Sequence, residues 1–276
     1  MVAHNTPNGV ILDLRLGAGS IEIATAEGDT TTVDLEPLGG EAARAAIAET
    51  TEELTPGPDG RMRLRVHVPR NKGGLLRFRG EPEIRMRIVA PPGADLQATT
   101  VSADVAAEGR LGTATVKTVS GDISLGALDG DAELKTVSGD VRCGDAAAGV
   151  HVDSVSGDAQ LERVAGNLAV KTVSGDVKTG PAGASVDLAT VSGDVRVASL
   201  RRGEAKLRSL SGDIDVAVER GTRVYMDAST LSGDAGSDLD LQDAPTTGDG
   251  AELMLEASTK SGDVRIRRAA ETAAGS

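Results

Sequence analysis

Hydrophobic residues recur through the middle of the chain with a fixed period of 18 residues. In the unit that begins at Val119, the apolar positions are separated by steps of 4, 2, 3, 4, 2 and 3 residues. Steps of 2 and 4 keep side chains on one face of a strand, whereas each step of 3 breaks the alternation and indicates a corner. The pattern predicts two strand segments per unit, with Val119, Ile123 and Leu125 facing inward and Ser120 facing outward.

The period is marked most clearly by the motif Thr-Val-Ser-Gly-Asp, whose serine recurs every 18 residues from a variant copy at Ser102 as far as Ser192. At Ser211, Ser232 and Ser261 the step lengthens to 19, 21 and 29 residues. A constant period of about 20 residues is typical of solenoids, in which each repeat buries its apolar face against its neighbours. We therefore predict an all-β fold, a β-solenoid (β-helix) of 18-residue coils.

Glycine and aspartate close each copy of the motif. We expect the glycine to lie where the chain bends or where it approaches the backbone of the next coil, and the aspartate to cap the bend by accepting backbone N–H bonds. The predicted structural turn ladder consists of Gly121, Asp122, Gly139, Asp140, Gly157, Asp158, Gly175, Asp176, Gly193, Asp194, Gly212 and Asp213.

The first third of the chain lacks the period but alternates apolar and polar residues in several short runs, which is typical of strands. Its alanine-rich segment, which begins with an acidic residue, predicts one short helix. The expected division is a disordered N-terminus at 1–9, a β-rich capping part at 10–95 with the helix near 41–54, the solenoid at 96–268, and a disordered tail at 269–276.

Three arginines, Arg265, Arg267 and Arg268, crowd the last predicted strand. Charge on a terminal strand discourages pairing between the exposed edges of two molecules. We therefore expect a monomer or a small oligomer, with no filaments.

Residues 61–87 carry nine Lys or Arg against two Glu, in a chain whose net charge is −13. One interpretation is a solvated strand face that forms salt bridges with acidic neighbours. The other is a surface that binds an acidic protein or an anionic membrane, because apolar side chains there adjoin positive charges. The candidate partner-binding residues are Arg70, Lys72, Leu75, Leu76, Arg77, Phe78 and Arg79.

Composition limits the partners that we expect. The negative net charge argues against general nucleic-acid binding, so a protein is the expected partner. The single Cys143 occupies an inward slot and is expected to be a buried, inert thiol. Because the sequence shows no long apolar segment and no leader pattern, we predict a cytoplasmic protein without a transmembrane segment.

Three stretches carry a family resemblance: Leu16–Ile23, Ile88–Gly93, and the reiterated Lys-Thr-Val-Ser-Gly-Asp with its following aliphatic residue. Together they resemble the bacterial β-strand-repeat family labelled "putative adhesin", whose related domains are called toastrack. The resemblance covers residues from about 10 to 268 and implies a β-repeat protein of unknown function. It implies no catalytic residues.

We therefore predict a non-catalytic scaffold or protein-interaction module that needs no cofactor. One alternative is a calcium-supported adhesin, although calcium-binding nine-residue repeats carry a different glycine pattern. The other is a polysaccharide-acting β-helix enzyme that uses paired carboxylates, such as Asp129 with Asp131 or Asp213 with Asp215. One Phe, one Tyr and no Trp leave almost nothing on which a sugar ring could stack.

Overall fold

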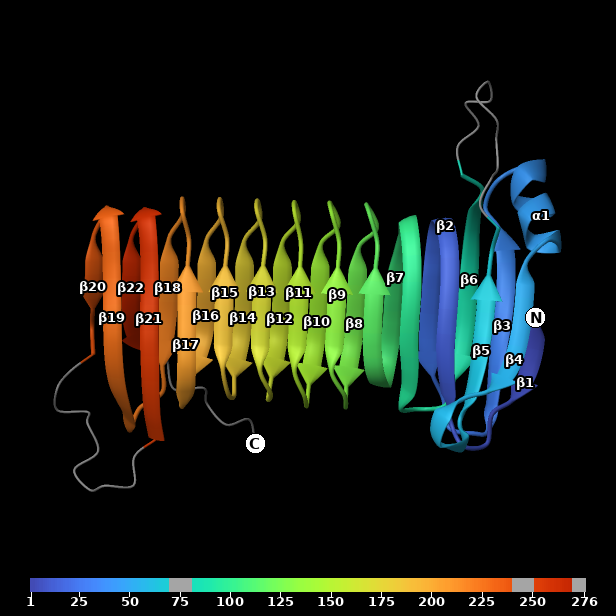
Figure 1. Ribbon diagram of the computed structural model, residues 1–276, viewed down its shortest axis with the longest axis horizontal. Coiled ribbons are helices and arrows are strands. Elements are labelled where there is room, and N and C mark those ends of the chain that lie inside the picture. The colour runs from blue at the N-terminus through green and yellow to red at the C-terminus, as the bar shows by residue number, and fades with distance from the viewer. Residues whose placement is uncertain (70–80, 240–250, 270–276) are drawn as a thin grey trace. The chain divides into compact units, whose positions relative to one another are not determined.

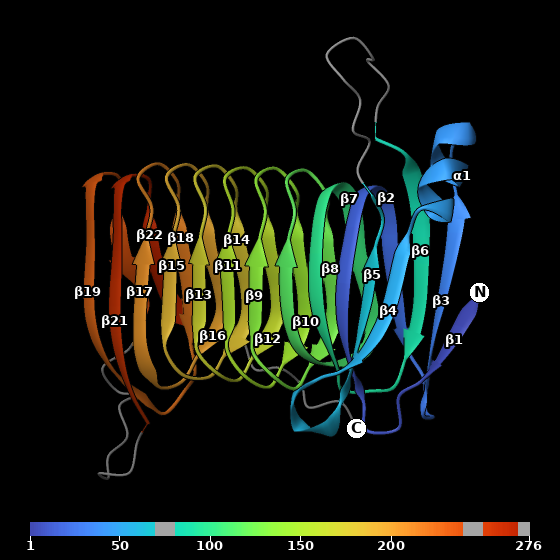
Figure 2. The same ribbon diagram turned by 45° about the vertical axis from the view of Figure 1, so that its right-hand side comes forward.

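The computed structural model describes residues 1–69, 81–239 and 251–269. As the periodicity predicts, the described chain is an all-β solenoid with one α-helix, and its strands are mostly paired in parallel. It divides into two compact units, residues 1–147 and 148–276. Figures 1 and 2 show the strands of each unit stacked side by side, with the helix at the N-terminal part.

The elements of the first unit are β1 (Val2–Asn5), β2 (Val10–Thr25), β3 (Thr30–Pro37), α1 (Glu41–Ala48), β4 (Thr51–Pro56), the 3₁₀ turn η1 (Pro58–Gly60), β5 (Met62–His67), β6 (Glu83–Ala90), β7 (Ala94–Lys117), β8 (Ile123–Leu128), β9 (Ala132–Lys135) and β10 (Val141–Ala146).

The long strand β2 organises the first unit. One of its edges pairs in parallel with β5 and then β6, while the other pairs in parallel with β7 from Ile11↔Asp95 to Ala24↔Glu108. The expected boundary near residue 95 therefore falls inside this unit, because the first coil shares a ladder with the N-terminal part. Strands β3 and β4 add to β6 and β5 in the antiparallel direction.

Two details of the N-terminal part differ from expectation. Residues 1–9, predicted to be disordered, contain β1, which pairs with β3 from Val2↔Val33 to Asn5↔Thr30 and so satisfies an edge of β3. The helix predicted near 41–54 ends at Ala48, because the residues that follow form β4 and pair with β5 instead. Of the predicted tail at 269–276, all but Ala269 lies outside the described residues.

The second unit contains β11 (Val150–Asp153), β12 (Ala159–Val164), β13 (Leu168–Lys171), β14 (Val177–Ala182), β15 (Val186–Ala189), β16 (Val195–Leu200), β17 (Gly203–Arg208), β18 (Ile214–Val218), β19 (Thr222–Ser232), β20 (Ala235–Ser237), β21 (Ala251–Ser261) and β22 (Val264–Arg268). Each early coil consists of a six-residue strand and a four-residue strand. Both pair with their counterparts 18 residues later, as in Ala159↔Val177 and Leu168↔Val186.

The core of the coils consists of aliphatic columns, as the spacing predicts for Ile123, Leu125 and the inward-facing Cys143, all of which are buried. The prediction that Val119 also faces inward is wrong. Val119 is 45% exposed, and the buried side chain is that of the preceding Thr118. The reason lies in the turn, where the Thr118 hydroxyl accepts a hydrogen bond from the Gly121 N–H at 3.0 Å.

The coils at the C-terminal end follow an order in space that differs from their order in sequence. Strand β21 pairs with β17 on one side and with β19 on the other, and β22 lies in the same way between β18 and β20. The prediction that Arg265, Arg267 and Arg268 guard a terminal strand is therefore wrong. Strand β22 is interior because β21 and β22, which come last in sequence, lie between the coil of β17 and β18 and the coil of β19 and β20.

Candidate functional site

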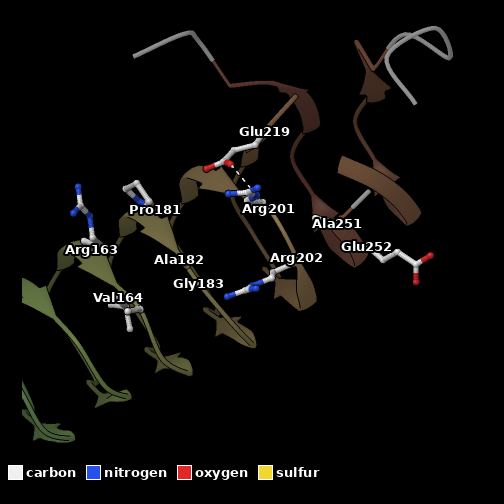
Figure 3. Close-up of a pocket in the computed structure, with 11 residues that line it drawn as sticks. Arg163, Val164, Pro181, Ala182, Gly183, Arg201, Arg202, Glu219, Ala251 and Glu252 are labelled. Atoms are coloured by element: carbon white, nitrogen blue, oxygen red, sulfur yellow. Dashed lines mark ion pairs between the residues drawn. The ribbon is translucent and has the colours of Figure 1, made fainter. Parts of the chain in front are cut away.

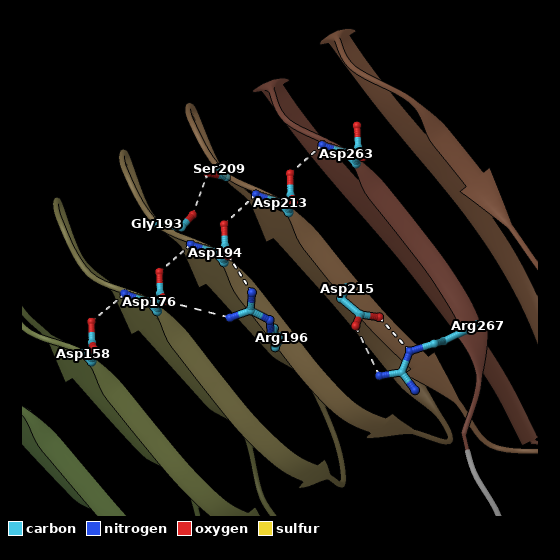
Figure 4. A network of polar contacts seen from close by, with 10 residues as sticks. All are labelled: Asp158, Asp176, Gly193, Asp194, Arg196, Ser209, Asp213, Asp215, Asp263 and Arg267. Atoms are coloured by element: carbon cyan, nitrogen blue, oxygen red, sulfur yellow. Dashed lines mark hydrogen bonds and ion pairs between the residues drawn. The ribbon is translucent and has the colours of Figure 1, made fainter.

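The aspartates of the repeated motif form a ladder of side-chain to backbone hydrogen bonds along each unit. In the first unit, the Oδ1 atom of Asp104 accepts from the Asp122 N–H, and that of Asp122 accepts from the Asp140 N–H, both at 2.9 Å. The second unit repeats the contact at 2.8–2.9 Å through Asp158, Asp176, Asp194, Asp213 and Asp263 (Figure 4). The Oδ1 atom of Asp263 then accepts from the Asp234 N–H at 3.0 Å. Each bond gives the carboxylate a fixed donor on the neighbouring coil.

Arginines neutralise part of this column of negative charge. Arg142 contacts Asp140 at 3.2 Å, Arg196 contacts Asp194 at 2.6 Å, and Arg265 contacts Asp263 at 2.7 Å. Like charges about 5 Å apart repel by roughly 0.8 kcal/mol in water, so these ion pairs reduce the repulsion between neighbouring carboxylates.

The carboxylates considered for catalysis or metal binding are committed to similar contacts. Asp129 forms an ion pair with Arg110, and Asp215 binds the Arg267 guanidinium through both oxygens at 2.9 and 3.2 Å. The Arg267 pKa is raised by this hydrogen bond to Asp215 and by its charge. Among residues 1–69, 81–239 and 251–269, no group of three or more His, Cys, Asp or Glu is arranged to hold a metal ion.

The glycines of the ladder stand where one coil touches the next. At Gly139 an added Cβ would collide with the carbonyl oxygen of Gly121 on the coil before it. At Gly193 the backbone has φ 150°, which L side chains rarely adopt. Close approach and backbone conformation, the two expectations for these glycines, therefore both occur in the described coils.

An exposed aliphatic row runs beside the ladder, with one side chain from each coil. In the second unit it consists of Val155, Val173, Val191 and Leu210, each 42–47% exposed. The serines that follow them are joined by parallel bridges, Ser156↔Ser174↔Ser192↔Ser211, so the row is continuous across the coils. The apolar spacing predicts that these residues face inward. Instead the hydroxyl residue before each of them is buried, and in two coils its hydroxyl donates to a glycine carbonyl: Thr190 to Gly175 at 3.3 Å and Ser209 to Gly193 at 3.1 Å.

A pocket of about 560 Å³ lies at another corner of the second unit. Its charged lining includes Arg163, Arg201, Arg202 and Glu219, and Figure 3 shows Arg201 directed toward Glu219, 3.8 Å away. In the part of the chain that the structure describes, no ion pair involves Arg163 or Arg202. The pocket is open to solvent and its arginines are exposed. It therefore presents positive charge at the surface but does not enclose a ligand.

The family model of Toastrack DUF4097 matches the sequence twice, over residues 10–180 and 146–275. These spans include both β2 and every coil of the ladder. The chain belongs to the Toastrack DUF4097 family. The resemblance inferred from the repeated motif is thereby confirmed, and the described fold of this toastrack chain agrees with it.

Two solved structures are similar to this toastrack chain. One, from Clostridium sporogenes, is described as a "putative cell adhesion protein", with 13% identity, coverage of 97% of this chain and 98% of the other, and a TM-score of 0.27. The other, from Bacteroides fragilis, is described as a "putative adhesin", with 15% identity, coverage of 97% and 96%, and a TM-score of 0.41. Both TM-scores are low, so the family match is what identifies the fold. No curated protein matches the sequence.

The basic segment of this toastrack chain is only partly described. The candidate partner-binding residues Arg70, Lys72, Leu75, Leu76, Arg77, Phe78 and Arg79 all lie outside the described residues. Several arginines on or next to the flanking strands form ion pairs with acidic side chains, for example Arg61 with Asp95 at 2.6 Å and Arg85 with Glu36 at 3.0 Å. These contacts correspond to the salt-bridged strand face that was the first interpretation of the segment.

One ion pair on this face makes stability depend on pH. Burial of the Asp13 carboxyl opposes its ionisation, but hydrogen bonds from His67 and Arg65, at 3.1 and 3.3 Å, outweigh burial and hold its pKa below the ordinary value. A lowered pKa stabilises the fold above the unfolded-state pKa of about 3.9, and the stabilisation is lost as the pH falls through the folded-state pKa.

We expect Asp13→Asn to lower the free energy of unfolding by about 1 kcal/mol at pH 6, with the difference from the native chain shrinking below about pH 4. Urea denaturation at pH 6 and at pH 3 measures both values. A difference that stays constant over this interval would show that the charge of Asp13 contributes nothing.

Proposed function

We propose that this toastrack chain is a non-catalytic scaffold that binds a protein partner through the exposed aliphatic row. The observation that supports this proposal is the row itself, in which Val155, Val173, Val191 and Leu210 are each 42–47% exposed. Single exposed apolar side chains are ordinary, but a contiguous apolar row bordered by polar residues is typical of an interaction surface.

The geometry of the row suits a repetitive or extended partner. Successive side chains come from strands paired in parallel, so they recur at roughly the 4.8 Å strand spacing. The serine after each aliphatic residue is exposed and presents a hydroxyl at the same interval. A partner segment with aliphatic side chains at a matching spacing would bury the row.

A cytoplasmic location agrees with the single buried thiol of Cys143, and the described chain has no helix that is long and apolar enough to cross a membrane. Function without a cofactor agrees with carboxylates that already have hydrogen-bond or ion-pair partners. Docking of an anionic surface by residues 61–87 depends on Arg70–Arg79 and stays a prediction.

The experiment is a pull-down in which the native chain and two variants are immobilised and the proteins that each retains are compared. Val173→Gln should lose a partner that the native chain retains, because it replaces part of the apolar row, whereas Lys178→Gln changes an exposed side chain on the adjacent strand and should retain it. Thermal unfolding checks that both variants are folded. Identical retention by the two variants would contradict the role of the row.

The alternatives predict different results with the same protein. A calcium-supported adhesin should melt at a higher temperature in millimolar calcium, because a ligand that binds only the folded state stabilises it. A polysaccharide-acting enzyme should turn over one member of a glycan panel and lose that activity in Asp213→Asn or Asp131→Asn. Either result would replace the scaffold proposal.

A further inference from the structure

The coil formed by β19 and β20 ends the second unit in the described structure. Strand β19 pairs in parallel with β21 from Thr222↔Ala251 to Ser232↔Ser261, and within the described ranges no other strand pairs with it. Its second edge therefore presents backbone N–H and C=O groups without a strand partner. Such an edge is a template for another strand unless charges, prolines or bulges protect it.

The apolar core is also open at this end. Met226 stands in the inward column directly above Leu255, yet Met226 is 48% exposed while Leu255 is 1% exposed. Val224, above the buried Leu253, is likewise only partly covered. Tyr225, on the outward face, is 55% exposed. Strand β21, which has a neighbour on each side, buries the equivalent Leu253 and Leu255, so the core row of β19 lacks the cover that a further strand would give.

The sequence of β19 is complementary to itself when the strand is reversed. If two copies pair in the antiparallel direction about a two-fold axis at Tyr225, Arg223 of each lies opposite Asp227 of the other. The same register sets Val224 opposite Met226, so the inward residues meet inward residues and the charges meet on the outward face. A surface that matches itself under a two-fold axis is what a symmetric dimer requires.

We propose that this end of the second unit is an interface with a second copy of the chain, formed by antiparallel pairing of the two β19 strands about Tyr225. The pairing supplies partners for the open edge and covers Met226 and Val224. The interface lies at the end of the solenoid, apart from the exposed aliphatic row, and it does not depend on the proposed partner of that row. The arginines of β22 do not oppose it, because that strand is interior.

Charge exchange tests the register. Light scattering across a micromolar concentration series should give a dimer for the native chain. Arg223→Asp or Asp227→Arg should each weaken the dimer at least tenfold, because like charges then face each other across the two-fold axis. The double exchange Arg223→Asp with Asp227→Arg should restore the dimer.

A control variant separates the dimer contact from a contact within the chain. Arg223 also lies 3.1 Å from Glu252, so Glu252→Gln removes that ion pair without changing the residues that face each other across the two-fold axis. It should leave the dimer intact. A native chain that is monomeric throughout the series, single exchanges without effect, or a double exchange that fails to restore the dimer would overturn the proposal.

Cross-linking tests the axis in the otherwise native protein. Directly opposed residues in an antiparallel pair have Cα atoms about 4.5–5.5 Å apart, within the range of a disulfide. Tyr225→Cys should therefore form covalent dimers under mild oxidation, since the native Cys143 is buried. Leu231→Cys, at a position that is 84% exposed, should not form them. Equal cross-linking of the two variants, or none at residue 225, would show that something other than a second copy covers this edge.

Discussion

Replacing Gly193 with alanine is expected to lower the free energy of unfolding by about 3 kcal/mol. Two costs combine. The backbone at Gly193 has φ 150°, and an added Cβ would collide with the carbonyl oxygen of Gly175. Neither backbone can move freely, because the Gly193 N–H donates to the Ser211 carbonyl at 3.0 Å and the Gly175 N–H donates to the Ser192 carbonyl at 3.0 Å.

Gly39→Ala is the matched control for this prediction. Gly39 is exposed, and the nearest atom to an added Cβ is the Cβ of Ala43 at 3.9 Å, an ordinary contact. We expect this change to stay within about 0.5 kcal/mol. Urea denaturation of both variants gives the comparison, and equal stability would mean that the coils separate enough to admit a side chain at Gly193.

The adjacent residues Thr136 and Val137 should differ in how much stability is lost when each is replaced by the other residue type. Thr136 is 5% exposed, and its hydroxyl accepts a hydrogen bond from the Gly139 N–H at 2.9 Å. Thr136→Val keeps the shape but removes this acceptor, and we expect a loss of about 1–3 kcal/mol. Val137 is 43% exposed, so Val137→Thr should change the stability by less than about 0.5 kcal/mol.

Thermal and urea unfolding of these two variants distinguish the observed orientation from the one that the apolar spacing predicts. If Val137 faced the core, its replacement would be the costly one. A larger loss in Val137→Thr than in Thr136→Val would therefore contradict the structure at this turn.

Much of the fold could be predicted because the period is exact over five steps. Identical coils stacked in parallel must pair residue i with residue i+18, and pairs such as Leu168↔Val186 follow directly. The orientation of Thr136 and Val137 could not be predicted in this way. The two side chains have nearly the same shape, and the choice between them depends on a hydrogen bond inside a turn, where the two-residue alternation stops.

The C-terminal end shows a different limit. The longer steps before Ser232 and Ser261 indicate irregular coils. They do not indicate that the last strand in sequence lies between earlier ones in space. Strand β21 instead lies between β17 and β19, which no periodicity encodes. The same holds for ion pairs such as Arg61 with Asp95, whose partners lie 34 residues apart in sequence. Only the sheet register brings them together.

The aspartate ladder makes the 18-residue coils of the second unit equivalent to one another. The Asp176 N–H donates to the Asp158 carboxylate, the Asp176 carboxylate accepts from the Asp194 N–H, and both contacts join positions 18 residues apart. Excising one whole period would therefore leave every remaining donor facing an equivalent acceptor. Duplicating one would do the same. Unequal recombination between the repeats can therefore lengthen or shorten such an array without creating a new kind of contact between coils. We expect the number of coils to vary among relatives.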